Sequence, residues 1–180
     1  ATEQKEARRR SGAGDAGWWR AWAGRGRGRG GDAGEQRDGV VGEGAALRMV
    51  GDGRVGVVLA GGTDASLVAA RMQAQSTGPV RGFSIGFSGS HHDEAPLAKE
   101  RAGHLGCDHT ERYVSGADAL AVVPQLPAMF DEPFADASQV PTALVARLAR
   151  QGVTVALSGD GGDELFFGYT RYVRALRNWQ

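Results

Sequence analysis

Short runs of apolar and β-branched residues alternate with longer helix-forming segments over most of the chain after residue 47. The apolar run at 54–60 ends at a glycine pair, as a buried parallel strand does, and the helix formers after it stop before Gly78. The same reasoning predicts further strands at 80–87, 109–114 and 153–157, and further helices at 93–105 and 144–150. This order indicates an α/β fold with an open, mostly parallel sheet and helices on both faces.

The first 46 residues show no such alternation. Residues 23–34 read AGRGRGRGGDAG, which offers no apolar face to bury. We therefore expect residues 1–46 to be a low-complexity, irregular and disordered segment, and residues 47–180 to form the domain. Trp18, Trp19 and Trp22 beside the Arg/Gly run could stack on single-stranded RNA. A linker or an abnormal extension of the reading frame is the interpretation we favour, because the patch is small.

Composition narrows the class of protein. The 21 basic and 21 acidic residues cancel, so no excess positive charge favours a dedicated nucleic-acid binder. Cys107 is the single cysteine, and the first residues contain no apolar signal stretch, so we expect a reducing, cytoplasmic setting. No apolar run approaches the roughly 20 residues that cross a bilayer, and we expect no membrane partner.

Two glycine-rich loops follow predicted strands. In residues 60–66, AGGTDAS, paired glycines would let the backbone approach a phosphate at the start of a helix, although a tight turn is the plainer alternative. This loop is neither GxxxxGK[ST] nor GxGxxG. Residues 158–163, SGDGGD, follow another strand, and strand ends of this kind meet at one edge. Because Mg²⁺ prefers carboxylates and phosphate oxygens, Asp64 and Asp163 are the predicted metal pair.

Four segments carry a family resemblance. VGVVLAGGTDASLVAA resembles the SGGxDS pyrophosphate loop of the ATP pyrophosphatases, whose fold is of the adenine nucleotide alpha-hydrolase type. FSIGF with HHDEAPLAKERAGHLGCDHTERYV, then DEPFADASQVPT, then LSGDGGDELFFGY resemble the C-terminal synthetase domain of glutamine-hydrolysing asparagine synthetases. NAD and GMP synthetases share the first loop, but we would not expect them to carry the last two segments. The resemblance extends from about residue 47 to residue 172.

The resemblance implies a two-step reaction with ATP and Mg²⁺. The side-chain carboxylate of aspartate would attack the α-phosphorus of ATP, giving β-aspartyl-AMP and pyrophosphate, and ammonia would then displace AMP to give asparagine. Ammonia would come from a glutaminase domain that we do not expect in this chain. Asp160 would take a proton during ammonia addition. The residues that the resemblance places at ATP or pyrophosphate are Leu59, Ala60, Gly61, Gly62, Asp64, Ser66, Ile85, Ser158 and Gly159.

Other polar residues have simpler interpretations. Residues 131–136 are either a capped turn before a helix or, as in the family, part of the substrate side of the cleft, and both remain open. No spacing among His91, His92, His104 and His109 is typical of a zinc site, so we expect them to be exposed. Cys107 should pack as a small apolar residue.

Several positions depart from the family pattern. Ala60 and Ala65 stand where serines are usual and Thr63 replaces an apolar residue, and each missing hydroxyl could cost about 1.5–3 kcal/mol of phosphate binding. Phe167 stands at a glycine position and is expected to narrow the entrance. The family's domain should continue beyond Gln180, so we expect a partial domain. The alternatives are a non-catalytic nucleotide-binding remnant and a β-lactam-synthetase-like ligase, although DEPFADASQVPT favours the asparagine synthetase branch.

Overall fold

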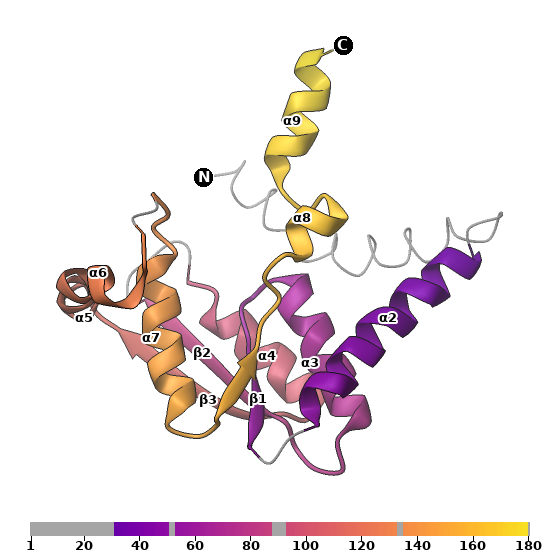
Figure 1. The fold of residues 1–180 in the computed structure, drawn as a ribbon, viewed down its shortest axis with the longest axis horizontal. Coiled ribbons are helices and arrows are strands. Elements are labelled where there is room, and N and C mark those ends of the chain that lie inside the picture. The colour runs from indigo at the N-terminus through magenta and orange to yellow at the C-terminus, as the bar shows by residue number, and fades with distance from the viewer. Residues whose placement is uncertain (1–30, 51–52, 88–92, 133–134, 180) are drawn as a thin grey trace. The chain divides into compact units, whose positions relative to one another are not determined.

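The computed structural model describes residues 31–50, 53–87, 93–132 and 135–179. The chain divides after residue 44 into two units, and the second contains a parallel sheet (Figure 1). The sheet has the order β3-β2-β1-β4, and every neighbouring pair runs parallel. Its strands are β1 (Val55–Val58), β2 (Arg81–Phe87), β3 (Asp108–Val114) and β4 (Val155–Leu157).

All the predicted strands and helices are present. The helices that pack on the sheet are α3 (Thr63–Gln75), α4 (Ala95–Leu105) and α7 (Gln139–Arg150). Helix α7 begins earlier than predicted. Pro141 does not prevent this, because it lies in the first turn of the helix, where its missing amide costs no hydrogen bond. The sequence analysis did not predict α5 (Gly116–Val122), η1 (Val123–Gln125), α6 (Leu126–Met129), α8 (Gly162–Phe166) and α9 (Thr170–Trp179).

The core lies on both faces of the sheet, because side chains along a strand alternate between faces. Val57 and Leu59 belong to a cluster with residues of α3 and α4. Phe83, which is 3% exposed, belongs to a second cluster with Val145 and other residues of α7. In Figure 1, α3 and α4 lie on one side of the strands and α7 on the other. The predicted open α/β fold is therefore confirmed.

Residues 31–46 are helical rather than irregular, contrary to the prediction. Helix α2 spans Gly31–Met49. Its last turns carry the helix formers of AALRM, and there Ala45 is buried in the first core cluster, with Met49 packed against it. Tertiary burial of this end outweighs the weak helix propensity of the glycines before it. Residues 1–30, including the tryptophans near the Arg/Gly run, lie outside the described residues, and the predicted domain boundary stays a prediction.

Within the described parts of the chain, no helix combines the length and apolar character that crossing a membrane requires.

Candidate nucleotide site

Two loops leave the carboxyl edge of the sheet side by side. The first loop, residues 60–62, connects β1 to α3, and the second loop, residues 158–161, connects β4 to α8. Strands β1 and β4 are adjacent and parallel, with Val57 opposite Leu157. Both loops therefore begin at the same level of the same edge, which confirms that they are neighbours as predicted.

Glycines in and after the second loop permit close contact with the start of α3. A Cβ on Gly159 would lie 2.8 Å from the carbonyl carbon of Asp64 and 2.9 Å from the Cα of Ala65. A Cβ on Gly162 would lie 2.6 Å from Asp64 Oδ2. Backbone atoms cannot move away from such contacts, so a side chain at Gly159 would force the second loop away from the start of α3.

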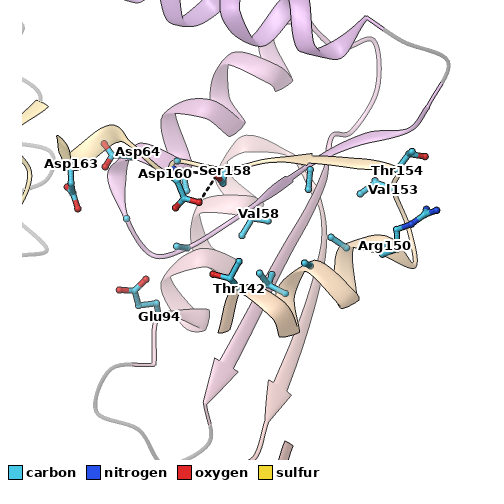
Figure 2. A pocket seen from close by; sticks show the side chains of 18 residues that line it. Val58, Asp64, Glu94, Thr142, Arg150, Val153, Thr154, Ser158, Asp160 and Asp163 are labelled. Atoms are coloured by element: carbon cyan, nitrogen blue, oxygen red, sulfur yellow. Dashed lines mark hydrogen bonds between the residues drawn. The ribbon is translucent and has the colours of Figure 1, made fainter. Parts of the chain in front are cut away.

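A cavity of about 660 Å³ lies between α7 and the β1–β4 part of the sheet, and it extends to both loops. Figure 2 shows the carboxylates of Asp64, Asp160, Asp163 and Glu94 among its lining side chains. The lining also has polar side chains, Thr142, Arg150, Thr154 and Ser158, and a set of apolar ones: Val58, Val145, Ala146, Ala149, Val153 and Ala156. The cavity thus offers an apolar surface at one part and acidic groups at another, which suits a ligand with an apolar ring and a charged group.

Asp64 and Asp163 both line the cavity, and they lie close enough for Asp163 to affect the pKa of Asp64. Burial raises the pKa of Asp64 above its usual value, and the neighbouring charges of Asp163 and Glu164 raise it further. The predicted acidic pair is therefore together on one side of the cavity. Two like charges at this range favour either a shared proton or a cation.

Mg²⁺ fits this pair only together with a ligand. In the described part of the chain, no three metal-binding side chains gather in one place. Mg²⁺ is commonly held by one or two carboxylates plus substrate phosphate oxygens. Asp64 and Asp163 therefore match a cation shared with a phosphate and do not form a metal cage by themselves.

The start of α3 presents backbone donors to the cavity. Gly62 is the N-cap residue in extended conformation, and no side chain of the described residues caps the helix there. Gly62, Asp64 and Ala65 line the cavity. Because the first amides of a helix have no partner within it, this end attracts an anion.

Two side chains of the α4 segment hold the first loop and were not predicted as site residues. The amide of Gly61 donates to Glu94 Oε2 over 3.0 Å. Arg101 Nη1 donates to the Gly62 carbonyl oxygen over 2.5 Å and to Ser66 Oγ over 2.9 Å. Both belong to HHDEAPLAKERAGHLG, so the signal that could have found them was a charged residue at the start of the predicted helix and another within it.

Ser66 is not among the residues that line the cavity. Its hydroxyl donates to the Gly62 carbonyl over 2.8 Å and accepts from Arg101. The Ser66 hydroxyl has a single proton to donate. To donate to pyrophosphate, the role expected for it, the hydroxyl would have to give up its hydrogen bond to the Gly62 carbonyl.

The predicted adenine contacts divide between the two faces of the sheet. Ile85 packs with the α7 cluster, on the face where the cavity lies. Leu59 is 2% exposed and its side chain packs in the cluster of α3 and α4. A contact with adenine through the Leu59 side chain does not fit this placement, because strand alternation directs it away from the cavity. Only the backbone of Leu59 remains for such a contact.

Ser158 and Asp160 form a local pair in the second loop. Ser158 Oγ donates to Asp160 Oδ2 over 3.0 Å, and the Asp160 amide lies 3.4 Å from Ser158 Oγ (Figure 2). Both residues line the cavity, and Asp160 is exposed. Its carboxylate is therefore open to a ligand, as a proton acceptor must be.

The structure supports the turn interpretation for residues 131–136. Asp136 accepts the Ser138 amide over 2.8 Å just before α7, and hydrogen bonds from Ser138 lower the pKa of Asp136. Thr142, further along the same motif, lines the cavity. The described residues of 131–136 thus form a hydrogen-bonded turn before α7 and are not among the residues lining the cavity, so a role at the substrate side of the cleft stays a prediction; residues 133–134 lie outside the described residues.

Phe167 does not narrow the cavity as expected. It is 70% exposed and is not among the described lining residues, and its ring lies 5.2 Å from that of Tyr172. Its φ of 58° is left-handed, at the end of α8. That backbone conformation favours glycine, which is the residue expected here in the family.

The histidine prediction is wrong for His109. His109 is partly buried, its Nε2 lies 2.9 Å from the Oγ of buried Ser84, and burial lowers its pKa. His104 is exposed as predicted, and His91 and His92 lie outside the described residues. Cys107 packs partly buried against the first core cluster, as predicted, and burial raises the pKa of its thiol.

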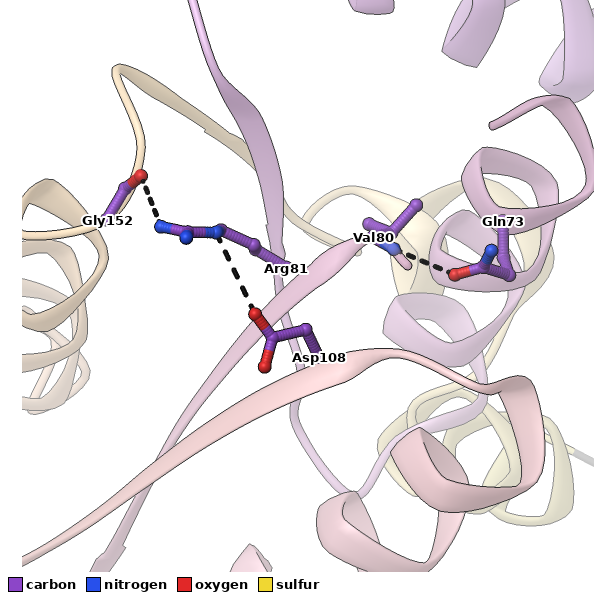
Figure 3. A network of polar contacts seen from close by, with 5 residues as sticks. All are labelled: Gln73, Val80, Arg81, Asp108 and Gly152. Carbon is purple, nitrogen blue, oxygen red and sulfur yellow. Dashed lines mark hydrogen bonds and ion pairs between the residues drawn. The ribbon is translucent and has the colours of Figure 1, made fainter. Parts of the chain in front are cut away.

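At the opposite edge of the sheet, where the strands begin, side-chain and backbone groups make polar contacts with one another (Figure 3). Arg81 Nη1 donates to the Gly152 carbonyl over 2.9 Å, and its Nε lies 3.8 Å from Asp108 Oδ2. The Val80 amide donates to Gln73 Oε1 over 2.9 Å. The polar groups named here are thus hydrogen-bonded at the edge where the strands begin. The backbone donors of the first loop and of the start of α3 lie at the carboxyl edge of the sheet.

Comparison with known proteins decides the family. Residues 38–180 match the family model described as asparagine synthase. The chain belongs to the asparagine synthase family. The match begins within α2, so it includes part of the segment that was expected to lie outside the domain.

Named relatives agree with this membership. The chain is 36% identical over 142 residues to asparagine synthetase (glutamine-hydrolysing) 1 of Bacillus subtilis, which is 79% of this chain and 22% of that protein. It is 35% identical over 140 residues to asparagine synthetase (glutamine-hydrolysing) 2 of Oryza sativa, which is 71% of this chain and 23% of that protein. This member of the asparagine synthase family therefore spans about a quarter of the length of these relatives.

Proposed function

We propose that this chain carries the ATP site of an asparagine synthetase. In this proposal ATP activates the side-chain carboxylate of aspartate as β-aspartyl-AMP with release of pyrophosphate, and ammonia then displaces AMP to give asparagine. The observation that carries the proposal is the meeting of both glycine loops with Asp64 and Asp163 at one cavity, in a chain of this family.

The cavity suggests how ATP would lie. The adenine would rest on the apolar lining beside Val58 and Val145, near Ser158 and Gly159. The phosphates would face the first loop and the amides at the start of α3, which stabilise the negative charge of departing pyrophosphate. Asp64 and Asp163 would hold Mg²⁺, and Mg²⁺ would add positive charge beside the same oxygens.

Asp160 would act in the second step. Its exposed carboxylate lies in the second loop, and as a base it would take a proton from ammonia as the amide forms. Aspartate and ammonia are thus the proposed substrates, as the names of the relatives suggest. Cys107 is a poor candidate for glutamine hydrolysis, because burial raises the pKa of its thiol and disfavours the thiolate. A cytoplasmic setting stays a prediction.

A non-catalytic nucleotide-binding module is the second candidate function. The observation that favours it is the presence of Ala60 and Ala65 on the cavity surface, where the family usually has hydroxyl groups. Such a module would keep the apolar lining and the backbone donors but stabilise the charge of pyrophosphate less well.

Exchange of labelled pyrophosphate into ATP tests the proposal. We expect exchange that depends on both aspartate and Mg²⁺, because adenylation of aspartate is reversible and needs the charge on pyrophosphate to be neutralised. Asp163→Asn should abolish exchange, whereas Glu100→Gln, which also removes one negative charge but at an exposed position on α4 that is not among the residues lining the cavity, should leave it intact. Mg²⁺-dependent ATP binding without exchange would favour the non-catalytic module. Absence of ATP binding by calorimetry would contradict both functions.

A further inference from the structure

The amide of Gly61 already has an anionic partner. Gly61 is buried, and a buried amide needs an acceptor. Its acceptor is the carboxylate of Glu94, at 3.0 Å. The two residues pack closely, since a Cβ on Gly61 would lie 3.1 Å from Glu94 Cβ and 3.4 Å from its Cγ. Glu94 lines the cavity, as do the two neighbours of Gly61, Ala60 and Gly62, whereas Gly61 itself, a predicted pyrophosphate residue, is not among the lining residues (Figure 2).

Helix capping does not account for Glu94. Glu94 is the N-cap residue of α4, but its side chain makes no capping hydrogen bond within the described residues. Asp93 accepts the amide of Ala95 over 3.2 Å in its place. The Glu94 carboxylate is therefore directed at the first loop rather than at its own helix.

We propose that Glu94 determines the phosphate affinity of this site by occupying a donor that the phosphate needs. The inference rests on the proposed function. One amide has one proton, so Gly61 donates either to Glu94 or to a phosphate oxygen. A phosphate beside Glu94 would also meet a like charge, together with those of Asp64 and Asp163.

Glu94 can leave the loop without entering the core. Its side chain is exposed, so the released carboxylate would be hydrated by solvent. Until then the Gly61–Glu94 hydrogen bond keeps the loop in its anion-binding conformation. When a phosphate binds, the Gly61 amide thus exchanges one charged acceptor, the Glu94 carboxylate, for another, a phosphate oxygen. The net affinity of the site for phosphate is therefore lower than it would be if the Gly61 amide had no other acceptor.

Glu94→Gln separates the charge from the hydrogen bond. The amide oxygen of glutamine can still accept from Gly61, but it is neutral and is a weaker competitor. Glu100→Gln is the matched control, because Glu100 lies exposed on the same helix and is not among the residues lining the cavity.

Calorimetry with pyrophosphate, with ATP and with adenosine, each with and without Mg²⁺, tests the inference. Glu94→Gln should tighten pyrophosphate and ATP binding by about threefold to tenfold, the range expected for weakening a charged hydrogen bond, and leave adenosine binding unchanged. Glu100→Gln should match wild type. Equal or weaker pyrophosphate binding in Glu94→Gln would overturn the inference, and weakening confined to Mg²⁺ would make Glu94 a metal ligand instead. If neither wild type nor Glu94→Gln binds pyrophosphate or ATP, the proposed function itself fails.

Discussion

The Asp64 carboxylate has opposite effects on proposed function and on stability: the proposed cation site needs it ionised, but its ionisation lowers the free energy of unfolding. Its raised pKa means that the folded state holds a proton more tightly than the unfolded chain, whose Asp pKa is about 3.9. Stability therefore falls as pH rises from about 3.9 through the raised pKa, because the folded state binds more protons in that interval. Above it, the ionised Asp64 lowers the free energy of unfolding.

We accordingly expect Asp64→Asn to be more stable than wild type at neutral pH and equal to it in strong acid. Urea unfolding at several pH values, in metal-free buffer, measures the difference. Asp131→Asn serves as the control and should show no comparable gain. A variant that is less stable at neutral pH would contradict the like-charge account of this pair. The same variant should bind ATP–Mg²⁺ more weakly, as expected when a stabilising change is made at a functional residue.

Restoring hydroxyl groups in the first loop tests its role at phosphate. Ala60→Ser combined with Ala65→Ser should raise nucleotide affinity by up to about two orders of magnitude, since each charged hydrogen bond contributes about 1.5–3 kcal/mol and neighbouring sites are not additive. Both positions line the cavity, where Ala60 is exposed and Ala65 is 6% exposed. Ala117→Ser on exposed helix α5 is the control. Unchanged ATP affinity in the double variant would indicate that the loop does not bind phosphate.

At the scale of elements, the contact between the second loop and the start of α3 decides whether the site exists. Gly159→Ala would place a methyl group against backbone atoms of Asp64 and Ala65. We expect a loss of about 1–3 kcal/mol in the free energy of unfolding, as in other overpacked sites, together with a large loss of ATP affinity. Chemical denaturation and calorimetry measure the two effects.

The control for this element is Gly103→Ala in α4. A Cβ there would meet nothing within 4 Å, so the variant should gain about 0.5–1 kcal/mol from better helix propensity. ATP affinity should not change. If Gly159→Ala behaved like Gly103→Ala, the loops would have to be further apart than the structure shows.

At the scale of the whole molecule, ligand binding should be visible as stability. A ligand that binds only the folded state adds about 2.7 kcal/mol to the free energy of unfolding at one hundred times its dissociation constant. We expect that gain with ATP and Mg²⁺ together and a smaller one with ATP and a chelator, because Asp64 and Asp163 repel the phosphates when no cation lies between them. Thermal unfolding at fixed ATP concentration makes the comparison. Equal gains under both conditions would exclude a metal shared with the nucleotide.

The sequence by itself determined the four strands, the three helices that pack on the sheet, the two glycine-rich loops and the family. These follow from local patterns: side chains alternate along a strand, helix formers repeat, and glycine pairs follow apolar runs. It also predicted that Asp64 and Asp163 come together, because parallel strands direct their carboxyl ends to one edge.

Only the tertiary structure decided which face each side chain occupies and which distant groups meet. Leu59 belongs to the predicted adenine-contact set by motif, yet it packs in the core on the other face, because the register of β1 fixes its direction. Helix α2 forms where glycines predicted irregular chain, since Ala45 is buried in the core. Gly61 and Glu94 are 33 residues apart, and their hydrogen bond depends on how α4 packs beside α3, which no local pattern encodes.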